Sequence, residues 1–397
     1  MQAKYVPSAE IENRISRLQN QLIEAKIDAA LIIYKMDLFY FSGTAQNASL
    51  FVPAEGKPLL MVVRDIDRAR KESPLPEVAP LDSVLGIPDL VQEQYGRIPH
   101  RIGLELDVVP VRDYLRYQRI FPKAKIVDSA GIIKKLRMIK SFYEVAQMKR
   151  AGEIGKIVYE KGRDILREGM SEIEFGGWLE LEAKKLEHEG LLRVRSLNYE
   201  AYTWHVLSGP SGSIVSQAES PMGGAGLSPA FPVGAGTRKI QAHEPVLVDF
   251  GICYNGYIVD QTRIYCIGDL PEKYVKAYEA SCKIEELVLD GARPGASAAA
   301  IFEKTVQYAK ELGYDESYLG IPGRKTTFVA HGVGLEINEI PFIAKGQNVF
   351  LEDHTTIAIE PKMVFSGEGA VGIENTVLIT DNGVEKLTTC SEEILQI

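Results

Sequence analysis

Apolar and polar positions recur along the chain with two periods, one typical of helices and one typical of strands. In residues 8–26, Ile11, Ile15, Leu18 and Leu22 recur every three or four positions, which predicts an amphipathic helix. Short apolar runs predict buried strands at Ala29–Tyr34, Leu59–Val63, Arg101–Leu106 and Lys125–Val127, with a helix around Val111–Arg119. Because strands and helices alternate, the pattern favours an α/β domain over roughly the first 130 residues.

The pattern changes in the rest of the chain. Long helices are predicted at Ser171–Glu189, Pro271–Asp290 and Ala296–Leu312, after a basic helix-like segment at Ile132–Ile157. Between them lie two stretches rich in strand-forming residues, 200–266 and 327–390. Helices followed by strands, twice over, indicate an α+β fold. The Gly-, Pro- and Ser-rich residues 219–236 are predicted to form a loop, and a loop of that length is often functional.

The strongest local signal is Asn255-Gly256, which separates two β-branched and aromatic runs within residues 246–265. Such a dipeptide predicts a tight β-hairpin. Each run carries one carboxylate in an otherwise apolar strand, Asp249 in the first and Asp260 in the second.

The turn decides whether these two carboxylates meet. If the dipeptide forms a two-residue loop, Asp249 faces Thr262, and Asp260 is its diagonal neighbour on the same face. If the loop slides back by one residue, Asp249 lies directly opposite Asp260. Two carboxylates so placed repel each other and lose hydration, so a metal ion between them is the simplest interpretation. The alternative is a pair of aspartates that face water on an edge hairpin.

Three further groups in β-rich surroundings extend this candidate site. They are His331, which is followed closely by glycines, and two glutamates in apolar runs, Glu360 and Glu374. Four carboxylates balance the charge of two divalent cations, and oxygen-rich coordination with one imidazole favours Mn²⁺ or Co²⁺, with Zn²⁺ or Fe²⁺ as alternatives. Two such ions about 3.5–4 Å apart activate a shared water and polarise a carbonyl, which is machinery for hydrolysis.

The net charge and the cysteines of the chain exclude several classes of protein. The net charge of −9 argues against a nucleic-acid or anionic-membrane partner. The four cysteines lack metal-site spacing and are interpreted as reduced core residues. No secretory signal or membrane-spanning run is apparent, so we expect a cytoplasmic protein.

The candidate residues also carry a resemblance. The settings VLVDFG, YIVDQTR, AHGVGLE, IAIEP and VGIENTVLIT resemble those of the metallopeptidase family that comprises Xaa-Pro aminopeptidases, Xaa-Pro dipeptidases (prolidases), methionine aminopeptidases and creatinase. Residues 132–151 resemble the start of the catalytic domain in the Xaa-Pro branch. Residues Ile27–Val63, which include Phe39–Gly43, resemble the creatinase-type N-terminal domain. The resemblance implies a pita-bread α+β catalytic domain over residues 132–397, preceded by a smaller creatinase-like α/β domain over residues 1–131.

The resemblance also assigns roles. Asp249, Asp260, His331, Glu360 and Glu374 would be the ligands of a dinuclear centre, and Glu360 would in addition handle the proton of the bridging hydroxide. The expected reaction is cleavage of the Xaa-Pro bond of a small peptide. The family further implies a homodimer.

Three positions depart from the family pattern. A histidine before the first aspartate is absent, with Pro232 near its place, and a second histidine is replaced by Asn338. An arginine two residues before the last glutamate is Gly372 here. His205 is a candidate substitute for one missing histidine, with a structural histidine as the equal alternative. His205, Asn338 and Glu360 are the predicted catalytic residues. The departures leave open a hydrolase or lyase of a small non-peptide metabolite, and, with less support, a non-catalytic binding protein.

Overall fold

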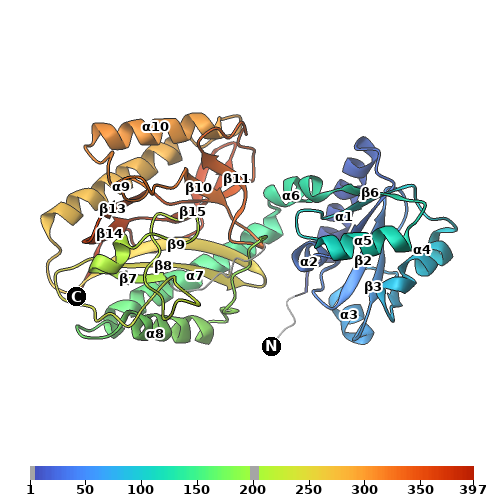
Figure 1. Cartoon of the computed structure of the whole chain (residues 1–397), viewed down its shortest axis with the longest axis horizontal. Helices are drawn as coiled ribbons and strands as arrows, with labels where there is room; N and C mark the ends of the chain where they lie inside the picture. Colours follow the sequence, from blue (N-terminus) through green and yellow to red (C-terminus); the bar gives the residue numbers. More distant parts are fainter. Residues whose placement is uncertain (1–4, 197–204) are drawn as a thin grey trace. The chain divides into compact units, whose positions relative to one another are not determined.

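The computed structural model describes residues 5–196 and 205–397. The chain folds as two compact units, the first ending at Arg137 and the second beginning at Met138 (Figure 1). Helix α6 (Ala130–Met138) ends at this boundary, so the domain boundary expected after residue 131 falls inside a helix.

The first unit is built on a six-stranded sheet in the order β4-β3-β2-β1-β5-β6. Its strands are β1 (Ala29–Ile32), β2 (Ala48–Pro53), β3 (Leu59–Val62), β4 (Val78–Pro80), β5 (Arg101–Leu104) and β6 (Lys125–Asp128). Its helices are α1 (Ser8–Glu24), α2 (Lys35–Ser42), α3 (Ile66–Glu72), α4 (Ile87–Tyr95) and α5 (Val111–Ile120). The four predicted strands and both predicted helices are therefore confirmed.

Four long helices belong to the second unit: α7 (Phe142–Ile165), α8 (Glu172–Lys185), α9 (Glu272–Gly291) and α10 (Ala298–Glu311). The predicted helix-like segment 132–157 is interrupted between α6 and α7. There Ile139 pairs with Thr355 in a β-bridge, and Ser141 begins α7 with a capping box. The predicted capping box of Ser171 and Glu174 is confirmed at the start of α8.

Helices enclose the strands of the second unit. A four-stranded sheet has the order β17-β9-β8-β7, a five-stranded sheet the order β11-β10-β12-β15-β16, and β13 pairs with β14. The strands are β7 (His205–Ser208), β8 (Val246–Tyr254), β9 (Tyr257–Cys266), β10 (Phe328–Gly332), β11 (Glu339–Ala344), β12 (Thr356–Ile359), β13 (Lys362–Phe365), β14 (Gly369–Gly372), β15 (Asn375–Thr380), β16 (Gly383–Lys386) and β17 (Leu395–Gln396). Figure 1 shows α7 and α8 on one side of these strands and α9 and α10 on the other.

The predicted hairpin is formed by β8 and β9. Asn255 and Gly256 both have positive φ angles, +49° and +84°, as a type I′ turn requires. Asp249 pairs with Thr262, which confirms the register that follows from a two-residue loop. Asp260 pairs with Gly251, so the two carboxylates are diagonal neighbours.

Two further expectations concern the whole chain. The cysteines are all free, and Cys253, Cys266 and Cys390 are buried, as core residues should be. Within residues 5–196 and 205–397, none of the helices combines the length and the apolar character needed to cross a membrane.

Candidate metal centre

The predicted site residues converge from five segments of the second unit. Asp249 lies on β8, Asp260 on β9 and His331 on β10, while Glu360 follows β12 and Glu374 precedes β15. All five line one cavity, and so do His205 and Asn338. The structure therefore brings together every residue that the sequence nominated.

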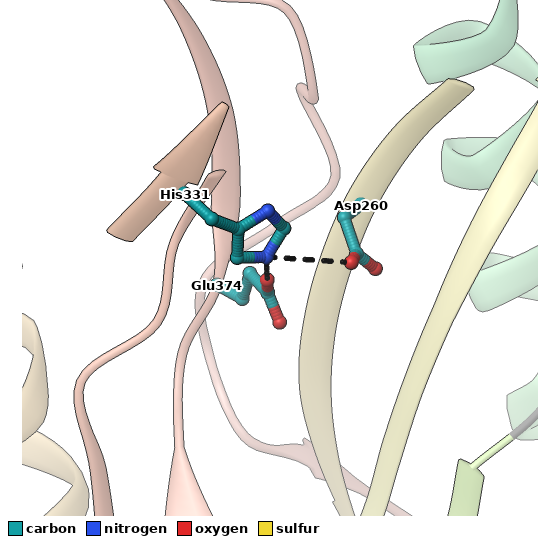
Figure 2. Close-up of side chains that lie close together, drawn as sticks. All are labelled: Asp260, His331 and Glu374. Carbon is teal, nitrogen blue, oxygen red and sulfur yellow. Dashed lines mark ion pairs between the residues drawn. The ribbon is translucent and has the colours of Figure 1, made fainter. Parts of the chain in front are cut away.

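His331 is the centre of a compact donor cluster. Its Nε2 atom lies 3.9 Å from Oδ2 of Asp260, 3.8 Å from Oε1 of Glu374 and 3.6 Å from Oε1 of Glu360. Figure 2 shows the imidazole ring directed at Asp260 and Glu374, which approach it from separate segments. One donor atom from each of these three residues lies within 4.8 Å of the other two.

The three distances from His331 Nε2 fit one divalent ion. A metal–ligand bond of about 2.1 Å allows two ligand atoms of the same ion to lie at most about 4.2 Å apart. All three distances from His331 Nε2 are shorter than this limit. The donor set of one imidazole and several carboxylates suits Mn²⁺, Co²⁺, Fe²⁺ or Zn²⁺, so Asp260, His331 and Glu374 are the residues that would hold the ion.

The carboxylates are crowded and shielded from water. Burial, followed by the charge of Asp249, raises the pKa of Asp260 well above its ordinary value. Burial and the charge of Asp260 do the same to the pKa of Glu374. Both carboxyl groups thus disfavour the ionised form until positive charge is placed beside them.

A lysine that the sequence reasoning missed supplies part of that positive charge. Nζ of Lys362 lies 2.8 Å from Oε2 of Glu360, 2.9 Å from Oε2 of Glu374 and 3.1 Å from Oδ2 of Asp249. The side chain has no exposed surface. Burial alone would lower the pKa of Lys362, but Asp249, Glu360 and Glu374 together raise it well above its ordinary value, so the amine is protonated.

The position of Lys362 affects how many metal ions the site can hold. A second ion bound through Asp249 and Glu374 would compete with the ammonium group, which already contacts both of these carboxylates and Glu360. The residues present therefore fit one divalent ion beside His331 and do not fit a second ion beside Lys362. A sequence signal existed, since Lys362 stands two positions after Glu360 before the apolar run Met363–Phe365.

The two other predicted catalytic residues border the cavity. His205 is the register partner of Asp249, and its Nε2 lies 2.9 Å from the carbonyl oxygen of Gly223. Burial lowers the pKa of His205, which favours a neutral ring that donates this hydrogen bond. Asn338 is half-buried at the cavity wall.

The remaining wall combines apolar side chains with a polar segment. Leu192, Val233, Phe250, Phe328 and Ile337 form apolar surface around the donor groups. The polar part is residues 216–220, and Val233 belongs to the predicted loop 219–236, so that loop does border the site. The lining is thus mostly polar, with the apolar side chains forming one part of the wall.

A buried glutamate that the sequence did not nominate secures this wall. Oε1 of Glu172 accepts hydrogen bonds from the backbone N–H and the hydroxyl of Ser208, both at 2.8 Å, and from the hydroxyl of Ser211. Its Oε2 accepts one from the N–H of Gly236 at 3.0 Å. Glu172 thereby ties the start of α8 to the end of β7 and to the end of the loop.

Comparison with known proteins identifies the relatives of this chain. Residues 146–381 match metallopeptidase family M24, and residues 14–139 match the creatinase/prolidase N-terminal domain. The Xaa-Pro dipeptidase of Pyrococcus furiosus is 27% identical over 392 residues, which cover 97% of this chain and 100% of that protein.

Solved structures agree on the fold. The Xaa-Pro dipeptidase from Bacillus anthracis superposes with a TM-score of 0.82 at 24% identity, covering 98% of this chain and 100% of that one. The X-Pro aminopeptidase from Thermotoga maritima gives a TM-score of 0.80 at 24% identity, covering 96% of this chain and 99% of that one.

Proposed function

Since the chain belongs to metallopeptidase family M24, with a creatinase-type N-terminal domain and a pita-bread catalytic domain, we propose that it is a metal-dependent peptidase that cleaves the bond before proline in small peptides. The observation that carries this proposal is the convergence of Asp260, His331 and Glu374 in one partly apolar cavity. The prolidase relatives support the choice of substrate.

We propose Mn²⁺ or Co²⁺ as the ion, with Zn²⁺ or Fe²⁺ as alternatives, held by Asp260, His331 and Glu374. When bound, such an ion supplies a Lewis acid that polarises the scissile carbonyl and acidifies a water molecule.

Glu360 is the proposed general base and acid. Its Oε2 is fixed by the hydrogen bond from Lys362, while Oε1 faces His331. A carboxylate held on one side and open toward the cavity can take a proton from water and pass it to the departing proline nitrogen. The amide of Asn338 is the proposed contact for the substrate carbonyl, and His205, whose single N–H donates to the carbonyl oxygen of Gly223, is proposed to hold the wall of the cavity beside it.

The apolar part of the wall supports the proposed preference for proline. A proline nitrogen in a peptide bond carries no hydrogen, so its ring loses no donor when it packs against Leu192, Phe328 and Ile337. The replaced histidines at Pro232 and Asn338 keep a second candidate open, a hydrolase or lyase of a small metabolite. A homodimer and a cytoplasmic location remain predictions from the family resemblance.

The test is cleavage of a mixed peptide pool by the Mn²⁺- and Co²⁺-loaded protein, followed by mass spectrometry. Half of the peptides should carry proline at the second position and half should not. We expect chelator-sensitive cleavage confined to the proline peptides. No cleavage of any peptide by protein that demonstrably holds metal would refute the peptidase function and favour the small-metabolite substrate.

A further inference from the structure

We propose that the ammonium group of Lys362 is a permanent cation of this centre and that the site accordingly takes a single divalent ion, beside His331. This inference deepens the proposed function, and it rests on that function for the identity of the ligands. It replaces the two ions that four carboxylates alone would suggest.

The hydrogen bonds of Lys362 are complete. An ammonium group has three N–H donors, and Nζ of Lys362 has three carboxylate acceptors, on Asp249, Glu360 and Glu374, at 2.8–3.1 Å. With no exposed surface, the group cannot exchange these partners for water without a rearrangement of the site. It is therefore a fixed part of the structure.

The two glutamates connect this ammonium to the ion site. Glu360 and Glu374 each place Oε2 against Lys362 and Oε1 toward His331. Glu374 thus bridges two positive positions, one occupied by Lys362 and one available to an ion, while Glu360 is held by Lys362 with Oε1 facing the ion position. The hydroxyl of Thr262 donates a further hydrogen bond to Oε2 of Glu374 at 2.8 Å, which holds the bridge in place.

The charge balance agrees with one ion. The carboxylates of Asp249, Asp260, Glu360 and Glu374 carry four negative charges, and Lys362 offsets one of them. One divalent ion leaves a single net negative charge. Two divalent ions would leave a net positive charge and would force the ammonium away from its three partners, at the cost of an unpaired buried charge.

Gly372 provides the space that Lys362 occupies. The two residues are register partners in the β13–β14 hairpin, and a Cβ atom at position 372 would lie 2.6 Å from Cγ of Lys362. Gly372 is also the position at which the sequence departs from the arginine of the resembling family. The lysine and the glycine therefore form one packing unit.

Lys362 acts through the carboxylates and not on the substrate, because its side chain has no exposed surface. It is a positioning residue. Its removal should change how many ions bind, which a residue that merely supports the fold would not do.

The experiment measures metal stoichiometry on the full chain, stripped with chelator and then dialysed against MnCl₂. We expect elemental analysis to find one Mn²⁺ per chain in the wild type. We expect two in Lys362→Gly, because the space that the lysine side chain occupied becomes free for a second ion. Electron paramagnetic resonance should show an isolated ion in the wild type and a magnetically coupled pair in the variant. Two ions in the wild type would overturn the inference.

A matched control and a second measurement keep the test decisive. Lys386 also pairs with carboxylates, with Glu285 at 3.4 Å and with Glu392, but it lies outside the site, so Lys386→Gly should keep one ion. If circular dichroism shows that the variant Lys362→Gly is unfolded, the number of ions can be determined by anomalous diffraction from Mn²⁺-loaded wild-type crystals. A single peak beside His331 supports the inference, and a second peak between Asp249 and Glu374 refutes it.

The outcomes for the two proposals are separable. One ion per chain without cleavage of any proline peptide would refute the peptidase function and leave the inference standing. Cleavage of proline peptides by protein that holds two ions per chain would refute the single-ion inference and support the peptidase function.

Discussion

Oε2 of Glu360 accepts a hydrogen bond of 2.8 Å from Nζ of Lys362, while Oε1 of the same carboxylate points toward the ion site. The carboxylate is thus held by a cation on one side and available for proton transfer on the other. Proton transfer by a positioned carboxylate contributes about 10²–10⁴-fold to a rate.

The first prediction concerns this group. Glu360→Gln should lower kcat by about 10²–10⁴-fold, because the amide cannot take up a proton, while the bound ion is retained by Asp260, His331 and Glu374. Steady-state kinetics and metal analysis check both expectations. Glu385→Gln, a change at a surface ion pair with Lys149, should match the wild type. Full activity of Glu360→Gln would exclude Glu360 as the base.

Removal of one ligand should abolish both metal binding and hydrolysis. Asp260→Ala takes away one of the three groups that surround the ion position, and with it one of the negative charges that attract the ion. Elemental analysis after gel filtration measures the loss. The control is Asp381→Ala in the exposed turn between β15 and β16. Full metal content in Asp260→Ala would refute the assignment of the ligands.

The third prediction tests the wall of the cavity. Glu172→Gln removes a buried charge that accepts hydrogen bonds from Ser208, Ser211 and Gly236. Since buried donors left unsatisfied cost about 1–3 kcal/mol, we expect the free energy of unfolding in urea to fall by about that amount.

The same variant should raise KM and leave the metal content unchanged, because Glu172 lies outside the ligand cluster. Glu303→Gln on the exposed face of α10 serves as the control. A drop in bound metal without any loss of stability would show that Glu172 belongs to the metal centre instead.

The fourth prediction concerns the dependence of stability on pH. The imidazole of His188 is buried, and Nδ1 accepts a hydrogen bond of 2.9 Å from the N–H of Cys253. Burial lowers the pKa of His188, although Glu180 acts in the opposite direction. Around pH 6 the unfolded chain therefore binds more protons at this position than the folded chain does.

It follows that the stability contributed by neutral His188 is complete above the unfolded pKa of about 6.5 and is lost as the pH falls below it. In His188→Asn the amide oxygen can accept the same hydrogen bond without titrating. Urea unfolding between pH 7.5 and 5 should show a steeper loss of stability for the wild type than for the variant. Equal slopes would contradict the prediction.

Interactions between residues close together in the sequence made much of this structure predictable. Asn255-Gly256 allows the two positive φ angles of a type I′ turn, and that turn alone fixes the register that brings Asp249 and Asp260 to one face. The capping box of Ser171 is equally local. His331, Glu360 and Glu374 could be nominated because charged groups in apolar strands need a reason to be there.

What the sequence did not reveal depends on distant parts of the chain. Lys362 is 113 positions from Asp249, so the ion pair between these two residues cannot be inferred from either segment alone, although Glu360 lies only two positions away. Glu172 meets Ser208 and Gly236 only after α8 has packed beside β7. The break between α6 and α7 likewise depends on Thr355, far along the chain.

The covalent attachment of Lys362 gives this cation a property that no free ion has. A dissociable ion stabilises the folded chain only as far as its free concentration exceeds its dissociation constant. A side chain, in contrast, is held at an effective concentration that neither dilution nor a chelator alters. When metal is scarce, the folded chain thus retains part of its countercharge, and competition among the metals of its surroundings acts on the position beside His331 alone.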